Sequence, residues 1–135
     1  MFAQLDTKSV YSFMDSVVDL NTYVKRAKEL GYQSIGLMDR DNLYAAYHFA
    51  QLAIRNGLRP LIGTEANLFY EGRKIPFRLL AKNNQGYKNL MKLATELSSG
   101  QREFTHFSDY LNDIALILPS EDWEPGMSLG SEVFI

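Results

Sequence analysis

Acidic side chains end or follow three short runs in the first half of the chain that are mainly apolar, at 2–6, 34–38 and 60–63. If these runs are parallel strands, their carboxyl ends meet at one edge of a sheet, where α/β proteins build their sites. Carboxylate oxygens suit Mg²⁺ or Mn²⁺, which points to a hard-cation site. The acids are Asp6, Asp39, Asp41 and Glu65, and two cations, Lys8 and Arg40, stand among them.

Simpler roles exist for some of these residues. An aspartate after a strand is often the N-cap of the next helix, and we favour that role for Asp41. No helical pattern follows Glu65, so a capping role does not explain it. His48 falls inside a predicted helix, as a surface or satisfied core residue, and His106 falls in a polar loop. With no cysteine and no histidine at a strand end, a zinc site is not expected.

The elements that would position these acids alternate regularly. Residues 19–30 have a helical period, with Asp19 at the N-cap and Gly31 just beyond the end. Residues 42–56 form a second predicted helix, closed by Gly57, and its aromatic residues are expected to have a packing role and not to form a ligand platform. Those aromatic residues are Tyr44, Tyr47 and Phe49. The β-α-β-α-β order predicts parallel strands covered by helices.

The second half of the chain has a different pattern. Runs at 66–70 and 75–81 flank a turn sequence and predict a hairpin-like insertion after the third strand. A helix at 84–97 and a strand at 114–118 follow. The predicted fold class is α/β, a partial or distorted parallel (β/α) barrel. Residues 1–120 form the expected domain, and 121–135 form a tail without a clear pattern.

Composition limits the possible functions. The 135 residues are 46% apolar and 22% charged, and the net charge is −2. Strong nucleic-acid binding by the chain alone is not expected, because such binding normally needs a basic excess. No apolar run approaches the length of a membrane helix, so we expect no membrane contact and a cytoplasmic location.

Four ordered motifs carry a resemblance to a known family. They are 4–15, which contains Tyr11-Ser12 and Asp15; 23–32, which leads to Met38-Asp39-Arg40; 60–65, which ends Ile62-Gly63-Thr64-Glu65; and 84–93, which contains Gly86-Tyr87-Lys88-Asn89-Leu90. Together they resemble the PHP (polymerase and histidinol phosphatase) domain that opens bacterial DNA polymerase III alpha subunits of the DnaE type. The resemblance covers roughly residues 1–97 and implies a PHP-type barrel.

The departures from that family concern its metal cluster, which the resemblance places at seven positions of this chain. These former metal-site positions are Gln4, Asp6, Lys8, Asp15, Asp39, Arg40 and Glu65. Histidines of the family are replaced at several of them, so we expect no bound metal and no catalytic residue. We hypothesise that Lys8 and Arg40 pair with Asp6, Asp39 or Glu65 in a metal-free ion network. The alternative is that both are ordinary surface cations.

The leading functional hypothesis is a structural and interaction module of a replicative polymerase. The resemblance implies a parent that is a DNA-directed DNA polymerase using Mg²⁺, with the 135 residues themselves neither catalytic nor dependent on a cofactor. The implied partners are the remainder of the alpha chain and a proofreading exonuclease or other replisome proteins. The alternative is a phosphoesterase that uses Mg²⁺ or Mn²⁺ on the strand-end carboxylates. A third reading, which the ordered motifs disfavour, is a small independent binding module unrelated to replication.

Overall fold

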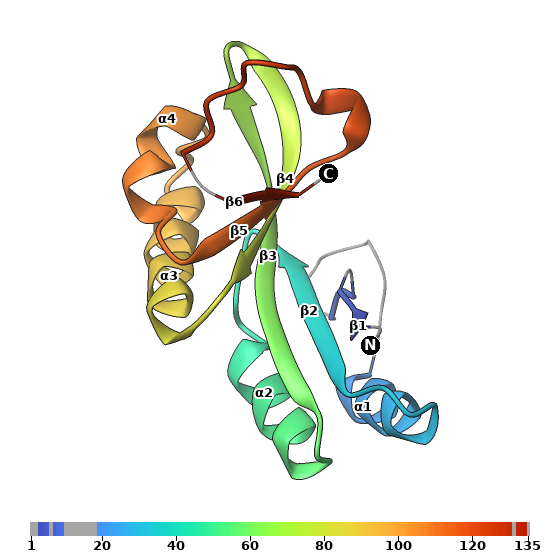
Figure 1. The fold of residues 1–135 in the computed structure, drawn as a ribbon. Coiled ribbons are helices and arrows are strands. Elements are labelled where there is room, and N and C mark those ends of the chain that lie inside the picture. Colours follow the sequence, from blue (N-terminus) through green and yellow to red (C-terminus); the bar gives the residue numbers. More distant parts are fainter. Residues whose placement is uncertain (1–2, 6, 10–18, 131, 135) are drawn as a thin grey trace. The chain divides into compact units, whose positions relative to one another are not determined.

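The computed structural model describes residues 3–5, 7–9, 19–130 and 132–134, with only the backbone at positions 3 and 4 (Figure 1). The chain divides into two compact units, Met1–Thr64 and Glu65–Ile135. The described strands are hydrogen-bonded in the order β1-β2-β3-β4-β5-β6, and β3 runs from the first unit into the second. No helix in the described ranges is long and apolar enough to cross a membrane.

The first unit repeats a strand and helix pattern. It contains β1 (Ala3–Gln4), α1 (Leu20–Glu29), β2 (Ser34–Arg40), α2 (Ala46–Arg55) and the start of β3 (Arg59–Tyr70). β1 and β2 are parallel, with Gln4 opposite Ile35. The contact continues beyond β1, because the Met38 amide donates to the Thr7 carbonyl at 2.7 Å. The predicted parallel pairing is therefore confirmed for these two strands.

Helix ends in the first unit follow local sequence signals with one exception. Asp19 caps α1 and accepts a hydrogen bond from the Asn21 amide at 3.3 Å. Gly31 and Gly57 adopt positive φ after α1 and α2, as predicted. The prediction that Asp41 caps a helix beginning at residue 42 is wrong, because α2 starts at Ala46 and Asp41 has a φ of 58°.

Asn42 explains the late start of α2. Its side-chain amide donates to the Arg40 carbonyl at 2.8 Å, and its side-chain oxygen accepts from the Tyr44 amide at 3.2 Å. Such local side-chain bonds compete with helical hydrogen bonds, so they hold these residues in a turn. The helix begins only after that turn is complete.

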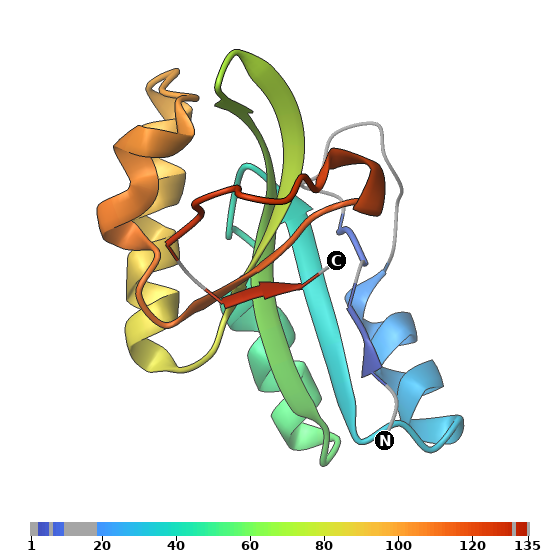
Figure 2. The same ribbon diagram turned by 45° about the horizontal axis from the view of Figure 1, so that its top comes forward.

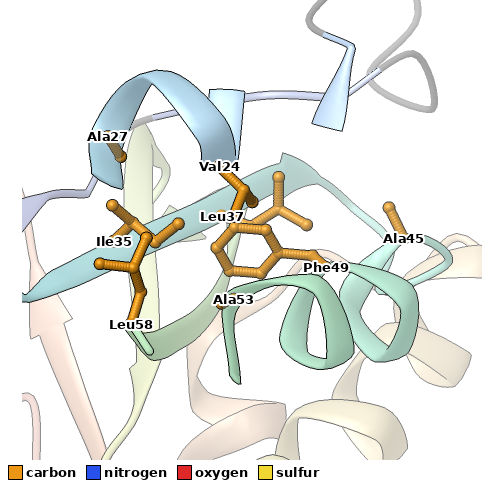
Figure 3. Close-up of a cluster of buried hydrophobic side chains, with 8 residues drawn as sticks. All are labelled: Val24, Ala27, Ile35, Leu37, Ala45, Phe49, Ala53 and Leu58. Carbon is orange, nitrogen blue, oxygen red and sulfur yellow. The ribbon is translucent and has the colours of Figure 1, made fainter. Parts of the chain in front are cut away.

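The core of the first unit lies where α1 and α2 cover one face of β2 (Figure 3). The Tyr23 and Phe49 rings stack with centroids 6.0 Å apart, and the Tyr23 hydroxyl donates to the Gly36 carbonyl at 2.8 Å. Burial raises the pKa of Tyr23 above its ordinary value. The buried cluster consists of Val24, Ala27, Ile35, Leu37, Ala45, Phe49, Ala53 and Leu58.

β3 differs from its prediction. The sequence predicted a strand at 60–63 and a separate one at 66–70, but the structure has one strand of twelve residues, Arg59–Tyr70. The predicted hairpin is present, because β4 (Arg73–Ala81) follows after only Glu71 and Gly72. Both turn residues have positive φ, which is typical of a tight two-residue hairpin turn.

In the second unit, α3 (Asn84–Ser98) packs against β4, the second strand of the hairpin, and against β5 (Ile114–Ile117) (Figure 2). β4 pairs antiparallel with β5, which pairs in parallel with β6 (Glu132–Phe134). The sequence did not predict β6, which lies in the expected tail. The other helical elements are α4 (Phe104–Phe107), η1 (Ser108–Tyr110) and η2 (Ser120–Asp122).

Two residues of α3 fix the turn before β5. A Cβ atom at Gly86 would overlap the Asp113 carbonyl oxygen, so glycine is required there for the close approach. One turn later, the Asn89 side-chain amide donates to the Asn112 carbonyl at 2.8 Å. Both residues belong to the motif 86–90, which therefore has a packing role in this structure.

Candidate functional site

Asp39 is the most deeply buried of the predicted site residues. It is the last residue but one of β2, and its exposed fraction is 0%. Its Oδ1 accepts from the Ser9 amide at 2.5 Å, and its Oδ2 accepts from the Ser9 hydroxyl at 2.6 Å. Because side chains alternate along a strand, Asp39 shares the face of Ile35 and Leu37, which the helices cover. Both oxygens of this carboxylate thus receive hydrogen bonds from one buried residue.

Ser9 has a role that the sequence did not predict. Its exposed fraction is 1%, and its two donors face the two oxygens of Asp39 across a separation of thirty residues. Charge-assisted hydrogen bonds of this kind are among the stronger ones in proteins. The pair therefore anchors the segment after β1 to the end of β2. One feature of the sequence could have indicated this role for Ser9. It is a small hydroxyl residue in the motif 4–15, three positions after Asp6.

Thr64 reinforces the same end of β2. Its buried hydroxyl donates to the backbone carbonyl of Asp39 at 2.8 Å. The residue lies on β3 within the first unit. Asp39 is therefore held through its side chain by Ser9 and through its backbone by Thr64.

Glu65 belongs to the second unit and lies inside β3, not at a strand end as predicted. It is 5% exposed, and its Oε2 lies 3.5 Å from Nε of Arg78 on β4. A guanidinium group can offset the desolvation of a buried carboxylate. The cation seen near Glu65 thus comes from the neighbouring strand of its own unit.

The structure describes only some of the other positions that the sequence predicted as former metal-site positions. Lys8 is half-buried and Arg40, at the end of β2, is exposed. Their pairing with Asp6, Asp39 or Glu65 stays a prediction. Gln4 lies on β1, and both Asp6 and Asp15 fall outside the described residues.

Neither histidine stands with these acids. His48 is exposed on α2. His106 lies in α4, not in a loop as predicted, and its Nε2 is 3.2 Å from Oε2 of Glu96. Within the described ranges, no three histidine or acidic side chains gather as a metal site would require. The described residues do not fit a histidine-rich metal cluster, because neither histidine lies with these acids and Ser9 donates to both oxygens of Asp39.

Comparisons with known proteins identify the family of this chain. The PHP domain family matches residues 4–123, and the chain belongs to this family. Among curated proteins, the DNA polymerase III alpha subunit of Streptococcus pyogenes serotype M1 is 47% identical over all 135 residues. That of Bacillus subtilis is 33% identical over 126 residues, or 89% of the chain. The chain covers only 13% and 11% of these two relatives, so it resembles a small segment of a much longer polymerase subunit.

Solved structures show the same fold. A provisionally assigned metal-dependent phosphoesterase from Bifidobacterium adolescentis matches 81% of this chain with a TM-score of 0.56 and 17% identity. An amidohydrolase from Chromobacterium violaceum, with bound sulfate and no metal, matches 82% with a TM-score of 0.53 and 18% identity. This chain covers 49% of each structure. The predicted α/β class is confirmed, and matching about half of a longer chain fits a partial barrel.

Proposed function

We propose that this chain is the PHP segment of a bacterial replicative DNA polymerase alpha subunit and acts there as a structural and interaction module. The single observation that carries the structural role is the Ser9–Asp39 pair, in which a former metal-site carboxylate receives two buried hydrogen bonds from the protein. The similarity to DNA polymerase III alpha subunits supports the polymerase context.

In this role, Asp39 contributes to folding. Two hydrogen bonds to one carboxylate hold Ser9, which follows β1 in the chain, against the end of β2. Within the second unit, the ion pair between Glu65 and Arg78 holds β3 against β4. Residues that a metal would otherwise hold together are then held by the chain's own donors.

The test is a calorimetric titration of Mn²⁺ into the purified chain, with a phosphoesterase assay on a simple phosphate ester run in parallel. We expect no saturable binding and no hydrolysis. A matched titration of Asp39→Asn separates specific from adventitious binding. Stoichiometric Mn²⁺ binding that this substitution abolishes, together with hydrolysis, would instead support the phosphoesterase alternative.

The polymerase context needs a separate experiment on the native gene. We expect the reading frame that encodes this segment to continue into polymerase sequence and the full-length product to extend a primed DNA template. The remainder of the alpha chain is then the first partner of the module, and a proofreading exonuclease is a candidate second partner. A frame that encodes no polymerase would contradict the proposal.

A further inference from the structure

Tyr44, Tyr47 and Ile54 form an exposed apolar strip on and just before α2, which we call the α2 strip. Their exposed fractions are 75%, 70% and 65%. The sequence predicted a packing role for both tyrosines, but neither lies in the core of this unit. Phe49 and Ala53 on the opposite side of α2 fill the core instead, as Figure 3 shows. The inner side of α2 is therefore already occupied, while a second apolar side remains in contact with water.

The α2 strip is organised within the chain itself. The hydroxyl of Tyr47 accepts a hydrogen bond from the side-chain amide of Gln51, one turn later, at 2.7 Å. A tyrosine held in one position loses less conformational freedom when a partner covers it. Tyrosine is also enriched at the centres of protein interfaces. These features are typical of a contact surface.

A comparison with α1 shows that such a surface is not a general property of this unit. The exposed side of α1 carries Lys25, Arg26, Lys28 and Glu29, as expected for a helix facing water. α2 has no acidic residue, and its exposed residues besides Tyr47 and Ile54 are His48 and Arg55, of which only Arg55 carries a fixed charge. An exposed helix side that is aromatic and nearly uncharged indicates a covering element.

We propose that the α2 strip is covered by the remainder of the polymerase chain, through an apolar segment with a carboxylate facing Arg55. This inference rests on the proposed function. The relatives that match the whole of this chain extend far beyond it, because the match spans only 13% of the Streptococcus pyogenes subunit. A segment of the same polypeptide is present at high effective concentration, so a small apolar surface is enough to hold it.

A second copy of the chain is the weaker candidate for this surface. A stable interface between separate proteins usually involves roughly 20–30 residues on each side. The α2 strip has three, which is too few to offset the entropy that two free molecules lose on association. An intramolecular contact avoids that cost, and for this reason we favour it.

The first test measures tyrosine nitration in the full-length polymerase chain that contains this segment. Tetranitromethane should modify Tyr44 and Tyr47 at least about tenfold more slowly in the native chain than in the same chain unfolded in urea, because covered side chains exclude the reagent. The protection should not depend on protein concentration. Equal rates in both states, or protection that is lost on dilution or needs an added partner protein, would overturn the proposal.

The second test uses matched variants of the full-length chain. Tyr47→Arg with Ile54→Arg places two charges on the α2 strip, and Asn21→Arg with Leu30→Arg places two charges on exposed positions in the first turn and at the C-cap of α1. We expect the first pair to lower the melting temperature by about 3 °C or more and the control pair to lower it by under about 1 °C. Equal shifts would overturn the proposal. Either result is independent of the Mn²⁺ titration, so a failure here leaves the non-catalytic role intact.

Discussion

Asp39 and Glu65 are both buried carboxylates, but they have different kinds of partner. Asp39, in the first unit, accepts hydrogen bonds from the amide and hydroxyl of Ser9. Glu65, in the second unit, lies beside the guanidinium of Arg78. A hydrogen bond requires that the donor points at its acceptor. A guanidinium also attracts a carboxylate through its positive charge. The comparison shows that a buried carboxylate in this fold can be stabilised either by directed hydrogen-bond donors or by a neighbouring cation.

The largest expected effect comes from Asp39→Ala. It removes the acceptors of both Ser9 donors and leaves these buried groups without that partner, which should cost about 3 kcal/mol of unfolding free energy. Urea denaturation of the purified chain measures this cost. Asp109→Ala, at an exposed position, is the control and should change stability by less than about 0.5 kcal/mol. A cost as small as the control's would show that the Ser9 bonds do not hold the fold.

Arg78→Met tests how much the neighbouring cation stabilises Glu65. It removes the cation beside Glu65, and we expect a loss of about 2 kcal/mol, below the value for a fully buried pair because the Arg78 side chain is 30% exposed. Adding Glu65→Gln should restore most of that loss, which a double-mutant cycle in urea measures. If the double variant is as unstable as the sum of both single variants, the two side chains are not coupled.

A smaller effect is expected for Ser9→Ala. The substitution removes the hydroxyl donor but keeps the backbone amide, so Asp39 retains one of its two bonds from this residue. We expect a loss of about 1 kcal/mol, clearly below that of Asp39→Ala. If Ser9→Ala and Asp39→Ala lower the free energy of unfolding equally, the hydroxyl of Ser9 provides nearly all of the stabilisation and its amide provides little.

The smallest expected effect on stability comes from Tyr23 at alkaline pH. Burial raises the pKa of Tyr23 above 10.0, and its hydroxyl donates to the Gly36 carbonyl. A raised pKa gives stability that is complete below pH 10 and is lost as the pH rises through the folded-state pKa. The stability of the chain should therefore fall more steeply above pH 10 than that of Tyr23→Phe, as urea titrations at several pH values would show. Parallel curves would mean that Tyr23 does not contribute.

The sequence correctly predicted those features of the fold that depend on residues a few positions apart. Asp19 and Gly31 were placed correctly because a cap side chain and a positive-φ glycine act within a few residues. The continuous β3 and the strand β6 were missed, since sheet pairing with distant segments decides whether a short run is extended.

The candidate site was predicted in part for the same reason. The acids were identified from residue type and their place in the chain, and Asp39 is buried near the end of β2 as that reasoning requires. Its partner Ser9 was missed because a contact across thirty residues leaves no local pattern. Glu65 was placed at a strand end because Thr64 and Glu65 appeared to interrupt an apolar run, although both are buried within β3.

The contact of α3 with the turn before β5 has a consequence for how sequences of this kind evolve. Gly86 and Asn89 fit the backbone at Asn112 and Asp113, so the helix and the turn constrain one another. Any change in that turn that moved the Asp113 carbonyl away from α3 would remove the requirement for glycine at 86. Substitutions at these two places should therefore appear together among related sequences, as linked changes in a helix and a turn more than twenty residues apart.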